Sequence, residues 1–208
     1  MKRTSGWTAA VIATGLLAVA SSALSAEVNT SKGHKELLFG FSGLSDLGAG
    51  SFNGGIGMRH YINDRTALRP GIQFGWSKHN PDGDNNDTRI TTGGANLAWE
   101  RHHASQVTSV SPYCGLGAGV NFAQSKTTVG TTGDDKTTGM GFSAYGLAGF
   151  ECGVADGVTL GGEYRLGFNW VKSKFEAAGS TTSVETTDTG LNLGSANGAM
   201  LYLGVHWK

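Results

Sequence analysis

Alternation with a period of two residues is the feature that most constrains this chain. From Ala67 to Trp76 every second residue, beginning with Leu68, belongs to one apolar set, and the residues between are polar or small. Successive side chains of a strand point to opposite faces, so this segment is predicted to be a strand with one apolar face. The same pattern recurs in residues 52–62, 112–122, 160–170 and 199–207.

Weaker alternation in residues 36–43, 90–101 and 140–152 brings the predicted strands to eight. Most approach the roughly 9–11 residues that a tilted strand needs to cross a bilayer. The chain is only 15% charged and has 34 glycines without a Gly-X-Y period, which fits neither collagen nor an ordinary soluble domain. These observations predict an all-β fold, an eight-stranded antiparallel up-and-down transmembrane β-barrel.

The N-terminus reads as a secretory signal peptide. Lys2 and Arg3 form a basic start, an apolar stretch follows, and small residues dominate up to Ala26. A retained membrane helix is the alternative, but the apolar run is shorter than the roughly 17–25 residues needed to span a bilayer. We expect cleavage within one residue of Ala26, with residues 1–26 as signal peptide and 27–208 as one exported barrel domain.

The connections between the predicted strands alternate in length. Those at 63–65 and 153–157 are short and that at 102–109 is intermediate, whereas 44–50, 77–87, 124–136 and 172–189 are longer and polar. Outer-membrane barrels have short periplasmic turns and longer extracellular loops. The asymmetry therefore predicts the cell outer membrane as the location.

The second hairpin carries a family resemblance. From Gly55 to Ile72, a glycine-rich strand ends near Tyr61, turns at Asn63-Asp64 and resumes as Ala-Leu-Arg. This resembles the outer membrane protein β-barrel domain family, the small barrels of OmpA and OmpX type. The resemblance implies contact with outer-membrane lipid and lipopolysaccharide, with the barrel-insertion machinery that reads the last strand, and with an extracellular ligand through the loops. The family usually ends on an aromatic residue, whereas here Lys208 follows Trp207.

Charged residues fall on the face opposite to the apolar one. Pairing residue 62 with 66 sets 60 against 68 and 56 against 72, which places Arg59 beside Arg69 inside the barrel. Like charges directly opposed are destabilising unless acids intervene. We therefore expect a hydrogen-bonded charge network in the lumen, with Tyr61, Gln73, Asn121 and Tyr145 as polar filler, formed by Arg59, Arg69, Glu100, Glu151, Glu163 and Arg165. A plug is the leading interpretation, and ion conduction or ion binding is the alternative.

Cys114 and Cys152 are the only cysteines, and such a pair in an exported protein suggests a disulfide. Pairing 114 with 152 across neighbouring strands also aligns Leu116 with Phe150. We expect either this cross-strand disulfide near the periplasmic rim or two free thiols, because neighbouring strands do not always give suitable sulfur torsion.

Other classes of function have little support. Sixteen Lys and Arg balance sixteen Asp and Glu, which leaves no basic stripe for nucleic acid. The glycine run 115–119 precedes no helix, as a nucleotide loop would require. His103-Ala104-Ser105 has the spelling of a lipid deacylase motif but falls in a predicted periplasmic turn, and the six histidines lack metal-ligand spacing. No cofactor or metal is predicted.

The prediction from sequence is a non-enzymatic outer-membrane barrel that anchors in the envelope, keeps a plugged polar lumen and displays its loops, above all residues 172–189. A small-solute channel or a transporter of hydrophobic ligands is the alternative.

Overall fold

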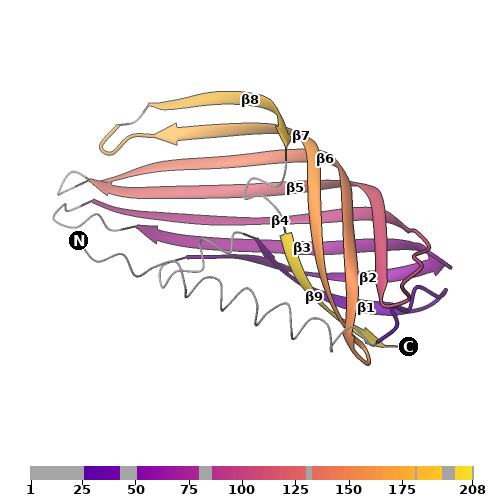
Figure 1. Ribbon diagram of the computed structural model, residues 1–208. Coiled ribbons are helices and arrows are strands. Elements are labelled where there is room, and N and C mark those ends of the chain that lie inside the picture. The colour runs from indigo at the N-terminus through magenta and orange to yellow at the C-terminus, as the bar shows by residue number, and fades with distance from the viewer. Residues whose placement is uncertain are drawn as a thin grey trace, which may run out of the picture.

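The computed structural model describes residues 26–42, 51–79, 86–129, 133–180, 182–193 and 200–207 (Figure 1). They form one antiparallel sheet of nine strands: β1 (Lys35–Ser42), β2 (Ser51–Asn63), β3 (Thr66–His79), β4 (Asn86–His102), β5 (Val110–Val129), β6 (Gly133–Ala155), β7 (Val158–Glu176), β8 (Ser183–Leu193) and β9 (Met200–Trp207). The predicted signal peptide, Ala26 excepted, lies outside the described residues. Within the described ranges, no helix has the length and apolarity to cross a membrane.

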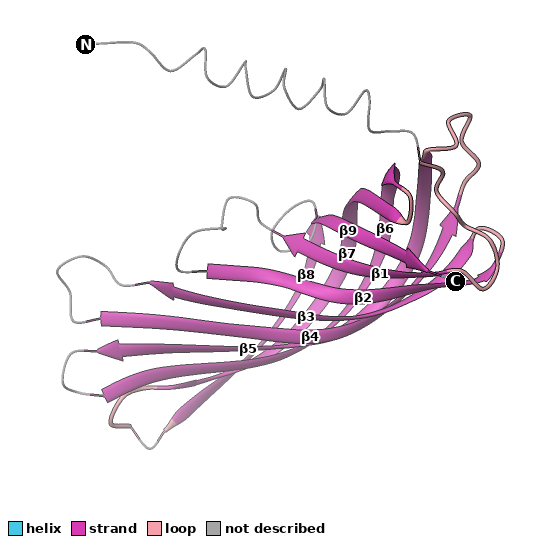
Figure 2. Ribbon diagram, turned by 90° about the horizontal axis from the view of Figure 1, so that it is seen from below, coloured by secondary structure: helices cyan, strands magenta, loops and turns pink. Residues whose placement is uncertain are grey.

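The sheet closes on itself. Strands β1 to β7 each pair with the next in chain order, and β1 also pairs with β9. Because β9 pairs in turn with residues 158–163 of β7, eight strands complete the ring, and β8 pairs with residues 166–176 of the same strand. Figure 2 shows the strands curving round one axis. The predicted antiparallel barrel is confirmed, and the ninth strand is an addition.

The strands at one end are longer than predicted. Most of the predicted loops 124–136 and 172–189 is strand. In the first range, β5 runs on to Val129 and β6 begins at Gly133; in the second, β7 runs on to Glu176 and β8 begins at Ser183. The prediction of long irregular loops there was wrong. Backbone pairing continues where both faces of a strand are polar, and β-branched Thr suits such strands, so the apolar alternation disappears before the hydrogen bonding does.

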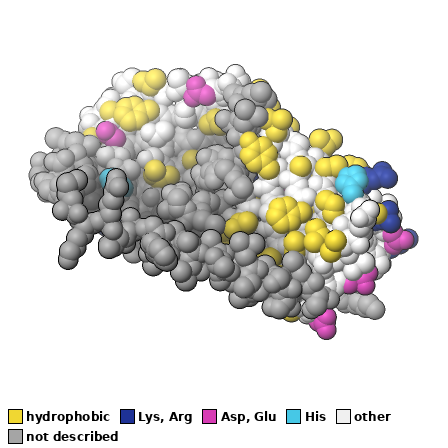
Figure 3. Space-filling view, viewed as in Figure 1, with side chains coloured by type: hydrophobic (Ala, Val, Ile, Leu, Met, Phe, Trp, Pro, Cys, Tyr) yellow, Lys and Arg dark blue, Asp and Glu magenta, His cyan; other side chains and the backbone are white. Residues whose placement is uncertain are grey.

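The two faces of the wall differ as the alternation requires. Ile72, Phe74 and Trp76 point outward with 59%, 48% and 50% of their surface exposed. Figure 3 shows such apolar side chains gathered over the wall, with Lys and Arg side chains at the end that carries the C-terminus and acidic side chains at both ends. The lumen instead holds a compact cluster of Leu38, Ala98, Tyr113, Leu147 and Tyr202. The predicted register of the second hairpin is confirmed away from the turn, since Ile56 pairs with Ile72 and His60 with Leu68. At the turn it is wrong: Thr66 pairs with Asn63 and not with residue 62, because the register shifts between Tyr61 and Asn63.

Residues 26–34, the N-terminal segment, cover the end of the barrel that carries the short turns. The Val28 amide donates to the Thr108 carbonyl at 3.2 Å, and the Arg65 amide donates to the Thr30 carbonyl at 3.1 Å. Val28 and His34 are buried. The segment is thereby fixed to the β4–β5 and β2–β3 connections at once.

Candidate functional site: a charge network in the lumen

The six residues predicted to form a lumen network lie on five strands and all face inward. Arg59 comes from β2, Arg69 from β3 and Glu100 from β4, while β6 supplies Glu151 and β7 supplies both Glu163 and Arg165. The first five are buried, and the Arg165 side chain is 14% exposed. The barrel brings all six into one connected set of ion pairs.

Arg59 is the centre of the set. Its Nη1 donates to Glu36 and to Glu151, and its Nε donates to Glu100 Oε2 at 2.7 Å. All four side chains have no exposed surface. An uncompensated buried charge costs about 3–5 kcal/mol, so this guanidinium stabilises all three carboxylates, and Glu151 has it as its one ion-pair partner among the described Arg and Lys side chains.

Glu100 separates the two arginines that the hairpin register places side by side. Its Oε2 accepts from Arg59, and its Oε1 lies 2.8 Å from Arg69 Nε. One carboxylate therefore bridges the two like charges, which is the intervening acid that the register demands.

The remaining part of the network is organised by Glu163. Its Oε2 lies 2.7 Å from Arg69 Nη2, and its Oε1 accepts from Arg165 Nε at 2.6 Å. The Tyr113 hydroxyl donates to Oε2 at 3.0 Å. Two guanidinium groups thus share one carboxylate, and Arg165 also lies over the Tyr145 ring at 4.7 Å.

Sequence reasoning missed Glu36, although it is fully buried against Arg59. It also accepts a hydrogen bond from Thr159 Oγ1 at 2.5 Å, and His206 Nε2 lies 3.1 Å away. A signal was present, because Glu36 falls on the face opposite to Leu37 and Phe39. The short alternation of that segment concealed it.

Histidines line the network on the side of the short turns. His102 Nδ1 is 2.8 Å from Ser111 Oγ and 3.6 Å from Glu151 Oε1, and His34 Nε2 is 2.7 Å from His206 Nδ1. Four carboxylates face three guanidinium groups in the network, so the excess negative charge is adjacent to these rings.

The four residues expected as polar filler divide into two groups. Tyr61 is fully buried, and its hydroxyl lies 3.4 Å from Glu151 Oε1. Tyr145 packs against Arg165. Asn121 and Gln73 lie farther along their strands, toward the long hairpins, and Gln73 is exposed.

The predicted pairing of Cys114 with Cys152 is wrong. Cys114 pairs with Ala148, Cys152 pairs with Val110, and both thiols are free. The displacement is four residues, about 13 Å along a strand, which is too far for a disulfide. A shift by an even number leaves every side chain on its face, so the alternation could not detect it.

His103 and Ser105 have different partners. His103 Nε2 lies 3.2 Å from Cys114 Sγ, whereas Ser105 Oγ accepts from the Val107 amide at 3.2 Å. Both residues are exposed in the β4–β5 connection. Among the residues that the structure describes, no group of three or more His, Cys, Asp or Glu side chains could hold a metal ion.

One solved structure supports the fold, and a second is reported for its similarity in sequence. The crystal structure of a major outer membrane protein from Thermus thermophilus superposes with a TM-score of 0.53 at 10% identity, over 84% of this chain and 99% of that one. Neisserial surface protein A is 20% identical over 84% of this chain and 95% of its own, with a TM-score of 0.38. No curated protein matches the sequence.

The sequence profile of one family matches residues 9–196, which is most of the chain. Its description is "Outer membrane protein beta-barrel domain". Together with the closed antiparallel sheet, this match places the protein in the cell outer membrane. The chain belongs to the outer membrane protein β-barrel domain family.

Proposed function

We propose that this protein is a non-enzymatic outer-membrane anchor whose lumen is plugged and whose long hairpins are displayed at the cell surface. The observation that carries the proposal is the buried set of ion pairs around Arg59, which connects β1, β2, β4 and β6 across the lumen. An eight-stranded barrel has an interior that side chains can just fill.

The rest of the lumen supports a plug. Tyr61, Tyr113 and Tyr202 are at most 2% exposed, so large rings fill the space beside the ion pairs. The N-terminal segment covers the end with the short turns. Water passing along the barrel axis would have to displace both the packed lumen side chains and the N-terminal segment.

Liposome swelling and planar-bilayer conductance test the proposal. We expect no solute flux and no conductance above a lipid leak from the wild-type barrel. A variant with Arg59→Ala, Glu100→Ala and Glu151→Ala should conduct, provided that heat-modifiable electrophoretic mobility shows a closed barrel. Flux through the wild-type protein would favour the small-solute channel or transporter instead.

A row of cations supports lipopolysaccharide as a partner. Lys78 pairs with Arg89, Arg89 with Lys126 and Lys126 with Lys136, so four cations occupy one rung of four adjacent strands. Neighbouring strands are about 4.8 Å apart, and directly opposed like charges are destabilising. Asp87 approaches Lys78 at 3.4 Å and Arg89 at 3.3 Å, which relieves part of this repulsion.

The row lies on the outward face, beyond the apolar surface. Lys78 follows Trp76 by two residues, and Lys126 follows Phe122 by four. We propose that it contacts the phosphate groups of outer-leaflet lipopolysaccharide. The double variant Lys126→Gln/Lys136→Gln should retain less copurifying lipopolysaccharide than the control Lys35→Gln, whose change is on β1 at the opposite end. If the two variants retain equal amounts of lipopolysaccharide, the proposal that this row of cations binds it is wrong.

The absence of enzymatic activity is tested through the only motif that suggested one. Lipid mass spectra of outer membranes should be identical with wild-type protein and with Ser105→Ala. A lipid mass shift that depends on Ser105 would overturn this part of the proposal.

A further inference from the structure

Positive charge in the lumen network is concentrated toward the long hairpins. Near the short turns, Arg59 faces three carboxylates. Toward the hairpins, Arg69 and Arg165 share Glu163. Arg69 also pairs with one oxygen of Glu100, whose other oxygen pairs with Arg59. The plug therefore presents a net cationic side to the outer end of the lumen.

The guanidinium groups become more accessible in the same direction. The side chain of Arg59 is 0% exposed, that of Arg69 is 6% exposed and that of Arg165 is 14% exposed. Apart from Glu163, the described hydrogen-bond partner of Arg165 is the Met200 sulfur, 4.0 Å from Nη2. A thioether is a weak acceptor, so the two Nη groups of Arg165 retain donor capacity.

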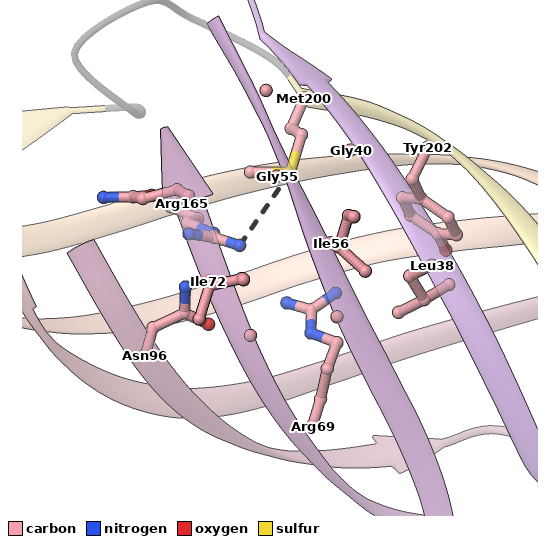
Figure 4. A pocket seen from close by; sticks show the side chains of 14 residues that line it. Leu38, Gly40, Gly55, Ile56, Arg69, Ile72, Asn96, Arg165, Met200 and Tyr202 are labelled. Carbon is pink, nitrogen blue, oxygen red and sulfur yellow. Dashed lines mark hydrogen bonds between the residues drawn. The ribbon is translucent and has the colours of Figure 1, made fainter. Parts of the chain in front are cut away.

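These donors border a cavity of about 60 Å³. Figure 4 shows Arg165, Arg69 and Asn96 around it, with Met200 on one side. Part of its wall is bare backbone of β1, β2 and β3, at Gly40, Gly55, Gly57 and Gly71. We call this space the cup.

Glycines keep the cup open. A Cβ on Gly40 would lie 3.2 Å from the Met200 sulfur, and one on Gly71 would lie 3.1 Å from the Asn96 amide oxygen. Gly117 leaves room for the Tyr145 ring, over which Arg165 lies, because a Cβ on Gly117 would come within 2.5 Å of that ring. Within the described part of the chain, the buried Tyr145 hydroxyl has no hydrogen-bond partner.

We propose that the cup binds a small carboxylate anion, with the Nη groups of Arg165 donating to its two oxygens and the Asn96 amide donating a further hydrogen bond. A planar guanidinium pairs with a carboxylate through two parallel hydrogen bonds. The volume accommodates about four water-sized groups, which is comparable to acetate. Glu163 opposes the anion, but both of its oxygens are already neutralised by Arg69 and Arg165.

The binding is independent of transport, because the cup is a recess on the outer side of the plug. A sealed barrel that binds carboxylate and one that does not are both compatible with the proposed anchoring function. Flux measurements therefore test the plugged lumen, and binding measurements test the carboxylate site, independently of each other.

Solution NMR of the purified barrel in detergent micelles tests the inference. Sodium acetate is titrated against sodium chloride at constant ionic strength, and the amide signals of Gly71 and Asn96 and the Arg165 Nε signal are followed. We expect saturable shifts with acetate only. Arg165→Gln should weaken acetate binding at least tenfold, whereas Lys172→Gln, on the outward face, should leave it unchanged.

A second variant guards against misfolding. Asn96→Ala keeps every ion pair of the network and should weaken acetate binding several-fold with unchanged heat-modifiable mobility. Inorganic phosphate, which is tetrahedral, should bind more weakly than acetate. Shifts that are identical with acetate and chloride, or unchanged acetate binding by folded Arg165→Gln, would overturn the proposal.

Discussion

Replacing Arg59 with methionine tests how far the lumen depends on one side chain. The change removes the charge and keeps an unbranched apolar chain in its place. Glu100 retains Arg69, and Glu36 retains Thr159 and His206. Among the described residues, Glu151 retains two weaker contacts, the Tyr61 hydroxyl at 3.4 Å and His102 at 3.6 Å.

The expected loss is about 3–5 kcal/mol of unfolding free energy, the usual cost of an uncompensated buried charge. This corresponds to roughly two to four orders of magnitude in the folding equilibrium constant. Urea unfolding in lipid vesicles, followed by tryptophan fluorescence, measures it. Arg165→Met is the matched control and should cost less, because Arg165 is partly exposed and Glu163 keeps Arg69 and Tyr113.

The double variant Arg59→Met/Glu151→Gln should recover at least about 1 kcal/mol relative to Arg59→Met, since contacting residues in one ion-pair network are coupled. A cost for Arg59→Met below about 1 kcal/mol, the range of exposed ion pairs, would refute the assignment of Arg59 as the centre of a desolvated network.

Three further predictions concern the wall and the hairpins. Hydrogen bonds from Lys126 and Thr128 lower the pKa of Asp134, on the β5–β6 hairpin, so NMR titration should find this pKa raised toward its ordinary value in Lys126→Ala. Mass analysis after alkylation should find two free thiols, Cys114 and Cys152, without reductant. Val120→Arg on the lipid-facing wall should cost about 2–4 kcal/mol in the same urea assay if that site is near the bilayer midplane; an unchanged midpoint would contradict a lipid-facing position.

Much of the barrel could be predicted because a bilayer enforces strict alternation on every strand that crosses it. Arg59 and Arg69 were assigned to the lumen from alternation alone, since a single step in phase would have put them in lipid. The positions along the axis were harder to predict. Cys114 pairs four residues away from its expected partner, and either register satisfies the same pattern.

The sequence predictions were wrong or incomplete where the bilayer does not constrain which residues are apolar. β8 contains Thr186, Thr187 and Asp188, whose polarity suggested a loop, yet the strand is hydrogen bonded to β7 along its length. The contacts of Glu36 depend on Arg59, Thr159 and His206, which come from three other strands. These contacts form only when the barrel is closed, so no local sequence pattern predicts them.

The hydrogen bond between Thr159 and Glu36 joins residues 123 positions apart, next to the place where β9 lies between β7 and β1. This hydrogen bond links β1 to β7 across the strand that closes the barrel. A half-assembled intermediate within the hydrocarbon would expose Glu36, Arg59 and Glu151 to lipid before they could find one another. Insertion into the bilayer and pairing of β9 with β1 and β7 should therefore be coupled, so that the acids and bases of the lumen are neutralised as the ring closes.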